Sequence, residues 1–335
     1  MKLRVASAIL WTCVSLLIVL PITAWGALAL WFRLSAPQVE GIVAACVFIL
    51  LGLGSMVALF TRHRMKGAVC FAVGFGGLLI WWSTIAPPDH GDWAPEVARQ
   101  TTGTVRGDVL TLSDVREFEW RSESDFDERW HERSYDLSKL KTVDLFLSYW
   151  GGPQMAHLIM SFGFDGGEQL AWSIEVRRER NGQYSPAADA FKTDTIVHLA
   201  TSERDTVRLR TNVRGEDVRL YRLRTPPEQA RALLLQYVEE ANALSAKPAF
   251  YNSITTNCTT AVATMVRAAG GSLPLDWRLV VNGYLPGYLY DRGAIVTTIP
   301  LSQVTALARI DDRAKVADRS PEFSRLIRIG VPSPR

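Results

Sequence analysis

The chain has 335 residues, of which 48% are apolar, 21% charged and 10% aromatic, and its formal net charge at pH 7 is +3. This composition is typical of globular proteins and excludes collagen-like, disordered and disulfide-scaffold chains. Six of the 37 basic residues and one of the 34 acidic residues lie in residues 1–88. The other 31 basic and 33 acidic residues give residues 89–335 a net charge of −2, so a basic nucleic-acid-binding surface is also excluded.

Residues 1–88 contain three long apolar runs, at about 5–32, 39–60 and 67–86. Each has the roughly 20 residues that a helix needs to cross a bilayer. A cleavable signal peptide is the alternative for the first run. However, the run is too long for the apolar h-region of a signal peptide, and two more runs follow it. The sequence therefore predicts a membrane anchor of three helices over residues 1–88 and a separate domain over residues 89–335.

The basic residues around these runs predict the orientation. Lys2 and Arg4 precede the first run, and Arg62, Arg64 and Lys66 lie between the second and third runs. The loop between the first two runs has one basic and one acidic residue, Arg33 and Glu40. Cytoplasmic loops carry the excess of Lys and Arg. Three crossings then place residues 89–335 outside the cytoplasmic membrane of a bacterium.

Residues 89–335 are predicted to form an α+β domain with an antiparallel sheet and packed helices. Alternating apolar and β-branched residues predict strands at 142–149, 157–164, 170–177, 195–199, 206–210 and 218–223. Helices are predicted at 227–246 and from about 257 to 269. Residues 110–140 show no clear pattern. The charged tail from Asp311 is expected to wrap the surface of the domain or to be partly disordered.

One cysteine of this domain is a candidate nucleophile. Three of the four cysteines lie in the apolar runs, and Cys258 alone lies in residues 89–335. It stands at the start of a predicted helix, where unpaired N–H groups and the helix dipole stabilise a thiolate and could face an oxyanion. The alternative is a small buried apolar side chain, since free cysteines are often buried.

A thiol nucleophile needs a base, and His157 is the first candidate. It begins a predicted strand after Gly151-Gly152-Pro153, and its alternative is a structural histidine. His198, within another predicted strand, is a second candidate base. His90 and His131 lie in segments expected at the surface.

The predicted hairpin supplies a candidate for the third member of a catalytic triad with Cys258 and His157. Asp165-Gly166-Gly167 is a turn signal between two predicted strands, and a turn centred on Gly166 places His157 opposite Glu175. Opposed residues of an antiparallel pair share a face, so Glu175 could orient the imidazole. A slip of one residue would break the pairing, and a salt bridge from Glu175 to a neighbouring arginine is the alternative.

Several stretches resemble the Lnb N-terminal periplasmic domain family of bacterial membrane proteins: Trp130–Leu140 (WHERSYDLSKL), Ala156–Phe164 (AHLIMSFGF), Ser173–Glu179 (SIEVRRE), Glu203–Asp205 and Phe250–Thr260 (FYNSITTNCTT). The resemblance implies a periplasmic, papain-like thiol domain with His157 and Cys258 as its dyad. The histidine precedes the cysteine, so the segments are permuted relative to papain. Permuted thiol enzymes such as lecithin retinol acyltransferase are similar in this order, whereas cell-wall peptidases of the NlpC type place the cysteine first. The family's namesake moves a phospholipid acyl chain to the amino terminus of a lipoprotein. It has a further C-terminal region, whereas three helices come first here.

The sequence therefore predicts a membrane-anchored thiol acyltransferase or acyl hydrolase. Its partners would be the phospholipid bilayer and a lipoprotein acceptor, and no metal or cofactor is needed. The N–H of Cys258, with Tyr251, Asn252 or Asn257, is expected to stabilise the oxyanion or contact substrate. The alternatives are a cell-wall peptide amidase or cysteine peptidase and a non-catalytic, membrane-tethered binding module. An apolar channel beside Cys258 would favour lipid, and a buried Cys258 distant from His157 would favour the binding module.

Overall fold

The computed structural model describes residues 9–34, 38–182, 184–253 and 255–334. It divides into two compact units. Unit 1 contains the chain up to Pro88 together with Ser185–Thr193, and unit 2 contains Asp89–Tyr184 and Asp194–Arg335. The short helix α5 (Pro186–Asp189) therefore groups with the apolar helices, which the sequence did not indicate.

Unit 1 consists mainly of three helices that are long and apolar enough to cross a membrane. They cover Ile9–Arg33, which includes a π-helical turn at Ser15–Val19 and α2 (Leu20–Arg33), then α3 (Gln38–Leu59) and α4 (Arg64–Thr84). The three predicted spans are confirmed as helices of this kind, although the expected start of the first span and its flanking Lys2 and Arg4 lie outside the described residues. α2 and α3 approach closely: a Cβ on Gly52 would lie 2.1 Å from Thr23 Oγ1. Small residues at helix contacts are typical of membrane helices.

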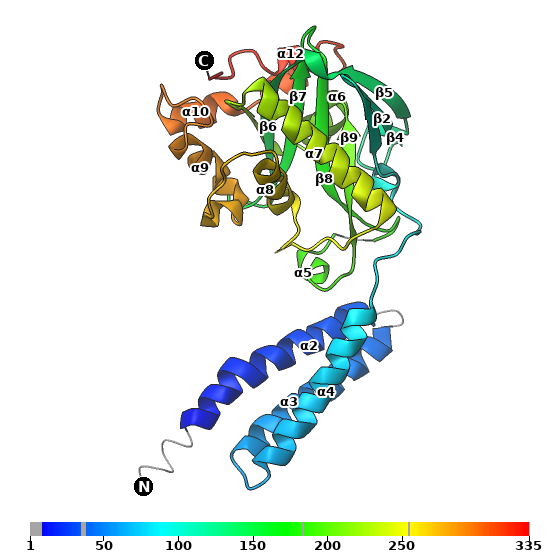
Figure 1. Ribbon diagram of the computed structural model, residues 1–335, viewed down its shortest axis with the longest axis vertical. Coiled ribbons are helices and arrows are strands. Elements are labelled where there is room, and N and C mark those ends of the chain that lie inside the picture. Colours follow the sequence, from blue (N-terminus) through cyan, green and yellow to red (C-terminus); the bar gives the residue numbers. More distant parts are fainter. Residues whose placement is uncertain (1–8, 35–37, 183, 254, 335) are drawn as a thin grey trace. The chain divides into compact units, whose positions relative to one another are not determined.

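Unit 2 is built on a mixed β-sheet whose strand order is β1-β2-β9-β8-β7-β6-β10, with β5 paired to β2 (Figure 1). The strands are β1 (Thr102–Arg106), β2 (Val109–Arg116), β5 (Trp130–Asp136), β6 (Leu140–Tyr149), β7 (Ala156–Phe164), β8 (Gln169–Arg177), β9 (Thr195–Thr201) and β10 (Asp217–Arg222). β3 (Glu119–Trp120) and β4 (Phe126–Asp127) form a separate pair. The sheet is antiparallel except where Arg116 of β2 pairs with Thr201 of β9, which differs from the fully antiparallel sheet that we predicted.

Helices cover both faces of this sheet. α7 (Pro227–Ala246) and α8 (Cys258–Ala268) lie over one face (Figure 1), and the larger core packs there, with α9 (Leu285–Asp291) and α10 (Leu301–Ala308) at its edge. The other face is covered by α6 (Glu203–Arg208), a π-helical segment at Leu209–Val213, α11 (Asp311–Ala317) and α12 (Phe323–Leu326). Short 3₁₀ turns lie at Pro95–Val97, Leu137–Lys139, Trp277–Leu279 and Asn282–Tyr284. The fold class is therefore α+β, as predicted.

The C-terminal tail is part of this second core, so the expectation of a surface wrap or disorder was wrong. Four side chains of the tail are at most 1% exposed and pack against Phe146 and Ile159 of the sheet: Ile310, Ala314, Phe323 and Ile327. The sequence of this charged tail did not indicate its two very short amphipathic helices, because segments of seven and four residues show little helical periodicity.

The segment predicted as a strand at 206–210 is helical, so that prediction was also wrong. The Ser202 hydroxyl caps α6 by accepting the N–H of Asp205 at 3.2 Å. The Asp205 carboxylate in turn accepts two hydrogen bonds from Arg116, one from the N–H of Phe118 and one from Trp120 Nε1. These tertiary bonds fix the helix against β2, and they outweigh the β-branched residues that favoured a strand.

The β7–β8 hairpin has the predicted register, which Ile159↔Ser173 and Phe162↔Leu170 define. Its turn uses Gly166 at φ +96°, a conformation that favours glycine. The β7–β8 ladder stops at Ile159↔Ser173, whereas β6–β7 pairs on to Ala156 and β8–β9 pairs on to Arg177. β7 and β8 therefore diverge beyond this point and open the sheet at His157.

Candidate active site

Cys258 is the first residue of α8, and the local sequence explains why the helix begins there. The Asn257 side chain accepts the N–H groups of Thr259 and Thr260, both at 3.0 Å, while the Thr260 hydroxyl accepts the N–H of Asn257. This reciprocal capping box fixes the helix terminus. Of the first three N–H groups of α8, those of Thr259 and Thr260 bind the cap and that of Cys258 does not. The Cys258 side chain is mostly buried, at 8% exposure.

His157 and Glu175 lie on the same side of the opened hairpin and contact each other. His157 Nε2 is 3.2 Å from Glu175 Oε1 and 2.7 Å from the Ser173 hydroxyl. The Ser173 hydroxyl donates to Glu175 Oε1 at 2.6 Å, so Nε2 of the imidazole carries the proton in this network. That tautomer leaves Nδ1 as the ring nitrogen available to accept a proton from the thiol.

Cys258 and His157 interact, and each shifts the pKa of the other toward an ion pair. Burial opposes ionisation of the thiol, but hydrogen bonds from His157, the N–H of Leu158 and Thr259, together with the charge of His157, lower the pKa of Cys258. Burial also disfavours the imidazolium, yet the Glu175 carboxylate and the hydrogen bond with Cys258 outweigh burial and the nearby Arg210, and they raise the pKa of His157. Both shifts act in the direction of a thiolate and an imidazolium.

Arg210 and Ser173 belong to this site, although neither was predicted from the sequence. Arg210 Nη2 donates to Glu175 Oε1 at 2.8 Å, and its Nη1 donates to the carbonyl and hydroxyl oxygens of Thr206. Burial alone would raise the pKa of Glu175, but His157 and Arg210 hold it well below its usual range. Arg210 escaped notice because its segment was expected to be a strand. Ser173, paired with Ile159 and two residues before Glu175, was already implied by the predicted hairpin register.

The residues proposed to assist the oxyanion occupy three different positions. Asn257 caps the helix, and its Nδ2 donates to the carbonyl of Ser253, so both ends of its amide are engaged. Asn252 accepts the N–H of Thr255 at 3.0 Å in the loop before the helix. Tyr251 lines the same cavity as His157 and Glu175. Of the three, Tyr251 is the one placed at the cavity of the histidine.

The other histidines of unit 2 lie away from this site. His198 on β9 is 2% exposed with its ring near Tyr237, and burial lowers its pKa to about 4, so it is neutral and poorly suited as a base. His131 is at the surface, 3.6 Å from Glu117, and His90 is exposed. Within the described ranges, no group of three or more His, Cys, Asp or Glu side chains is arranged to hold a metal ion.

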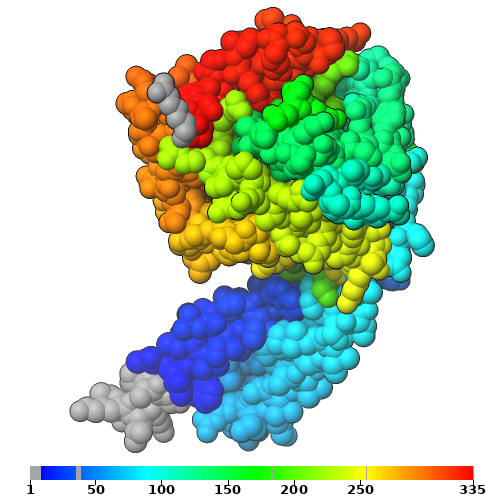
Figure 2. Space-filling model, turned by 45° about the horizontal axis from the view of Figure 1, so that its top comes forward, coloured from blue at the N-terminus to red at the C-terminus, as the bar shows by residue number. Residues whose placement is uncertain are grey.

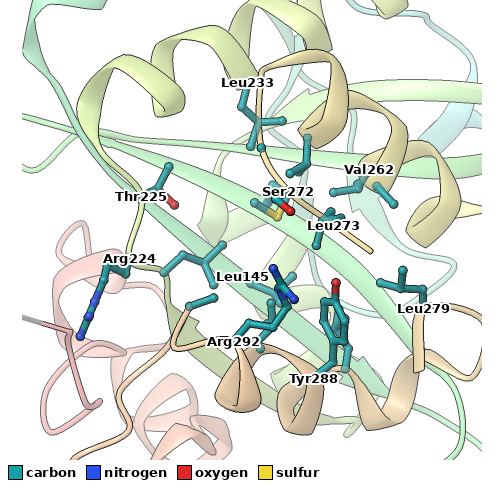
Figure 3. A pocket seen from close by; sticks show the side chains of 18 of the residues that line it. Leu145, Arg224, Thr225, Leu233, Val262, Ser272, Leu273, Leu279, Tyr288 and Arg292 are labelled. Carbon is teal, nitrogen blue, oxygen red and sulfur yellow. The ribbon is translucent and has the colours of Figure 1, made fainter. Parts of the chain in front are cut away.

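Two cavities adjoin the dyad. The first, of about 370 Å³, is mainly apolar and lies between β6, β7, α7, α8 and the segment after α8 (Figure 3). Leu158 and Thr259, the sequence neighbours of His157 and Cys258, form part of its wall. In Figure 3 the guanidinium of Arg224 points away from this cavity. The second, of about 470 Å³, contains His157 and Glu175 and is lined largely by charged side chains.

The charged side chains that line the second cavity are equal in number for the two signs and are paired. Four carboxylates and four guanidiniums line it, and the structure pairs them: Glu96 with Arg178, Glu175 with Arg210, Glu123 and Glu216 with Arg214, while Arg116 pairs with Asp205. The exposed rings of Trp150 and Tyr184 lie 5.9 Å apart at the same cavity. A ligand there would meet polar groups and aromatic edges, unlike in the apolar cavity.

The fold and the three apolar helices together define a membrane protein with an α+β domain outside the membrane-spanning part. Residues 126–283 match the family model of the Lnb N-terminal periplasmic domain, and this part of the chain belongs to that family. The match includes His157, Glu175, Arg210 and Cys258 but ends before α9. No curated protein and no solved structure matches the chain.

Proposed function

We propose that this protein is a thiol-dependent acyltransferase or acyl hydrolase that takes its acyl group from a phospholipid. It would span the cytoplasmic membrane of a bacterium three times and carry its catalytic domain in the periplasm, with a permuted papain-like arrangement. The observation that carries the proposal is the apolar cavity bordered by Leu158 and Thr259. Both residues also contact the Cys258 sulfur, Leu158 through its N–H and Thr259 through its hydroxyl at 3.9 Å. An acyl chain in this cavity would end beside the thiol.

In the first half of the reaction, the thiol proton moves to Nδ1 of His157 and the Cys258 sulfur attacks the ester carbonyl carbon. The oxyanion that forms is stabilised by the N–H of Cys258 and the positive end of α8. When the intermediate collapses, the carbon–oxygen bond to the glycerol breaks and the imidazolium returns its proton to the leaving alkoxide. The products are an acyl-thioester on Cys258 and a lysophospholipid.

In the second half, an amine or a water molecule attacks the thioester carbonyl and gives its proton to His157. The carbon–sulfur bond then breaks, and the thiolate is restored as an amide or a fatty acid leaves. The amino terminus of a lipoprotein is the acceptor that we propose. Glu175 would act as a positioning residue in both halves, because its contact with Nε2 holds the imidazole and favours its protonated form.

The charged cavity favours a second candidate, an amidase that cleaves cell-wall peptides. His157 and Glu175 line this cavity, and its carboxylates and guanidiniums suit a peptide better than an acyl chain. The same dyad would attack an amide carbonyl. The non-catalytic alternative receives less support, because Cys258 is buried but hydrogen-bonded to His157 rather than distant from it.

The test is the mass of the intact protein after incubation with phospholipid vesicles. The acyltransferase proposal predicts an added acyl mass on Cys258 that neutral hydroxylamine removes, and no adduct in Cys258→Ala. His157→Ala should slow adduct formation by about 10²–10⁴, the usual contribution of a general base. His131→Ala, a surface histidine, is the matched control and should behave like the wild type.

An adduct that persists in Cys258→Ala would contradict the assignment of the nucleophile. No adduct with lipid, together with cleavage of a cell-wall peptide that depends on Cys258, would instead support the amidase. If neither reaction occurs, the binding module is the remaining interpretation.

A further inference from the structure

The segment that follows α8 is apolar on both of its sides. Its inward side chains Leu273, Leu279, Leu285, Tyr288 and Leu289 line the apolar cavity. Its outward side chains are also large and apolar: Leu275, Trp277, Val280 and Tyr284 are 93%, 61%, 60% and 41% exposed. These four, which we call the apolar rim, lie within ten consecutive residues.

Two rings of the apolar rim are neighbours, and hydrogen bonds and close packing hold its backbone in place. The rings of Trp277 and Tyr284 lie 5.3 Å apart. Asn282 Nδ2 donates to the carbonyl of Ala156 and to the Thr259 hydroxyl, both at 2.7 Å, and so ties the segment to β7 and α8. Gly283 touches the loop before β7, where a Cβ would lie 2.1 Å from the carbonyl oxygen of Pro153. The rim side chains are therefore exposed by a fixed backbone.

The surroundings of the rim favour a lipid surface as its partner. Exposed apolar patches usually mark an interaction site, and Trp and Tyr are enriched where proteins meet the membrane interface. The exposed Arg292 lies in the same region and suits anionic headgroups, whereas Arg278 is already paired with Asp276 and Asp291. Figure 2 shows this region, in gold and orange, at the surface of unit 2. The three spans in the same chain also keep a bilayer at high effective concentration.

We propose that the apolar rim inserts into the interface of the bilayer, so that the segment separates lipid on its outer side from the acyl cavity on its inner side. The docking rests on the exposed side chains and the three spans. It does not depend on the covalent step of the proposed function, and it would hold if that step were absent.

The experiment uses the full chain in vesicles of phosphatidylethanolamine and phosphatidylglycerol. Leu275→Cys is labelled with an environment-sensitive fluorophore in a background where Cys13, Cys46 and Cys70 are serine and Cys258 is alanine. Lipids with a nitroxide on the acyl chain are then added as quencher. Val316→Cys is the matched control, because Val316 is an apolar residue that is 89% exposed on the separate helix α11.

The proposal predicts a loss of fluorescence at position 275 and none at position 316, because interfacial side chains sit about 5–10 Å deep, within reach of the nitroxide. Val280→Cys, labelled in the same way, should follow position 275. Equal quenching at positions 275 and 316 would overturn the docking. A blue shift at 275 without quenching would also overturn it, because a second copy or another protein would then cover the rim. Since Cys258 is absent from these variants, neither outcome depends on acyl transfer.

Discussion

Removing the negative charge of Glu175 is the sharpest perturbation that the dyad offers. Glu175→Gln keeps the shape of the side chain but leaves His157 without its carboxylate partner at 3.2 Å. Two unit charges at that distance interact by roughly 1 kcal/mol in water and about 5 kcal/mol at an effective dielectric constant of ~20. His157 and Glu175 side chains are only 14% and 21% exposed, so the upper part of this range applies. Arg210 would also remain buried beside the imidazole without its counter-charge.

The expected result is a lower pKa of His157 and a higher pKa of Cys258, since the thiolate loses its imidazolium partner. The alkylation rate of Cys258 by iodoacetamide near pH 6 should therefore fall by about tenfold or more, because each 1.4 kcal/mol changes an equilibrium tenfold. The inflection of the rate against pH should move to higher pH. Peptide mass spectrometry separates Cys258 from the three membrane cysteines.

The control is Glu96→Gln, which removes a carboxylate from the same charged cavity but one that pairs with Arg178. It should leave the alkylation profile of Cys258 unchanged. If Glu175→Gln gave the same profile as Glu96→Gln, the carboxylate would have no part in activating the thiol. Our interpretation of the ion pair would then be wrong.

Four further predictions test the fold, the cavity and the topology. Asn257→Ala removes the capping box of α8 and should destabilise the domain by about 1 kcal/mol in thermal unfolding, and no loss would show that the cap is dispensable. Phe323→Ala should cost about 3–5 kcal/mol, because Phe323 is 1% exposed in the second core; a surface tail would give almost no change. Ala263→Phe should block the apolar cavity and slow acylation of Cys258 by long-chain phospholipids while leaving its alkylation intact, whereas unchanged acylation would argue against an acyl site there. A reporter enzyme that works only in the cytoplasm should be silent when fused after Arg335, and strong activity would reverse the orientation.

The parts of the fold that could be predicted are those with strong local signals. The Asp165-Gly166-Gly167 turn fixed the register of its hairpin, because only glycine accepts these backbone angles easily. Extending this register past the last paired residues predicted the contact between His157 and Glu175. The long helix α7 was predicted to within a residue, since prolines bound it at both ends. The start of α8 at Cys258 follows from the Asn257 cap.

The parts that could not be predicted depend on contacts between distant segments. Arg210 reaches Glu175 because Asp205 anchors α6 to Arg116, almost ninety residues earlier in the chain. No residue spacing in the sequence indicates the hydrogen bond between Arg116 and Asp205. The parallel pairing of β2 with β9 and the burial of Phe323 are likewise tertiary, and the residues that separate these elements carry no signal for them.

The two halves of the dyad, His157 and Cys258, lie about a hundred residues apart in the chain. β7 and β8 are neighbours in sequence, so His157, Ser173 and Glu175 meet through a short turn with little loss of chain entropy. Cys258 joins them only when the loop from β7 to α8 has closed. Until then its thiol has the ordinary pKa of a free cysteine, about 8.5, and is mostly protonated near neutral pH. The lowered pKa of the Cys258 thiol is therefore a property of the completed domain, and we expect this thiol to become reactive only at that stage.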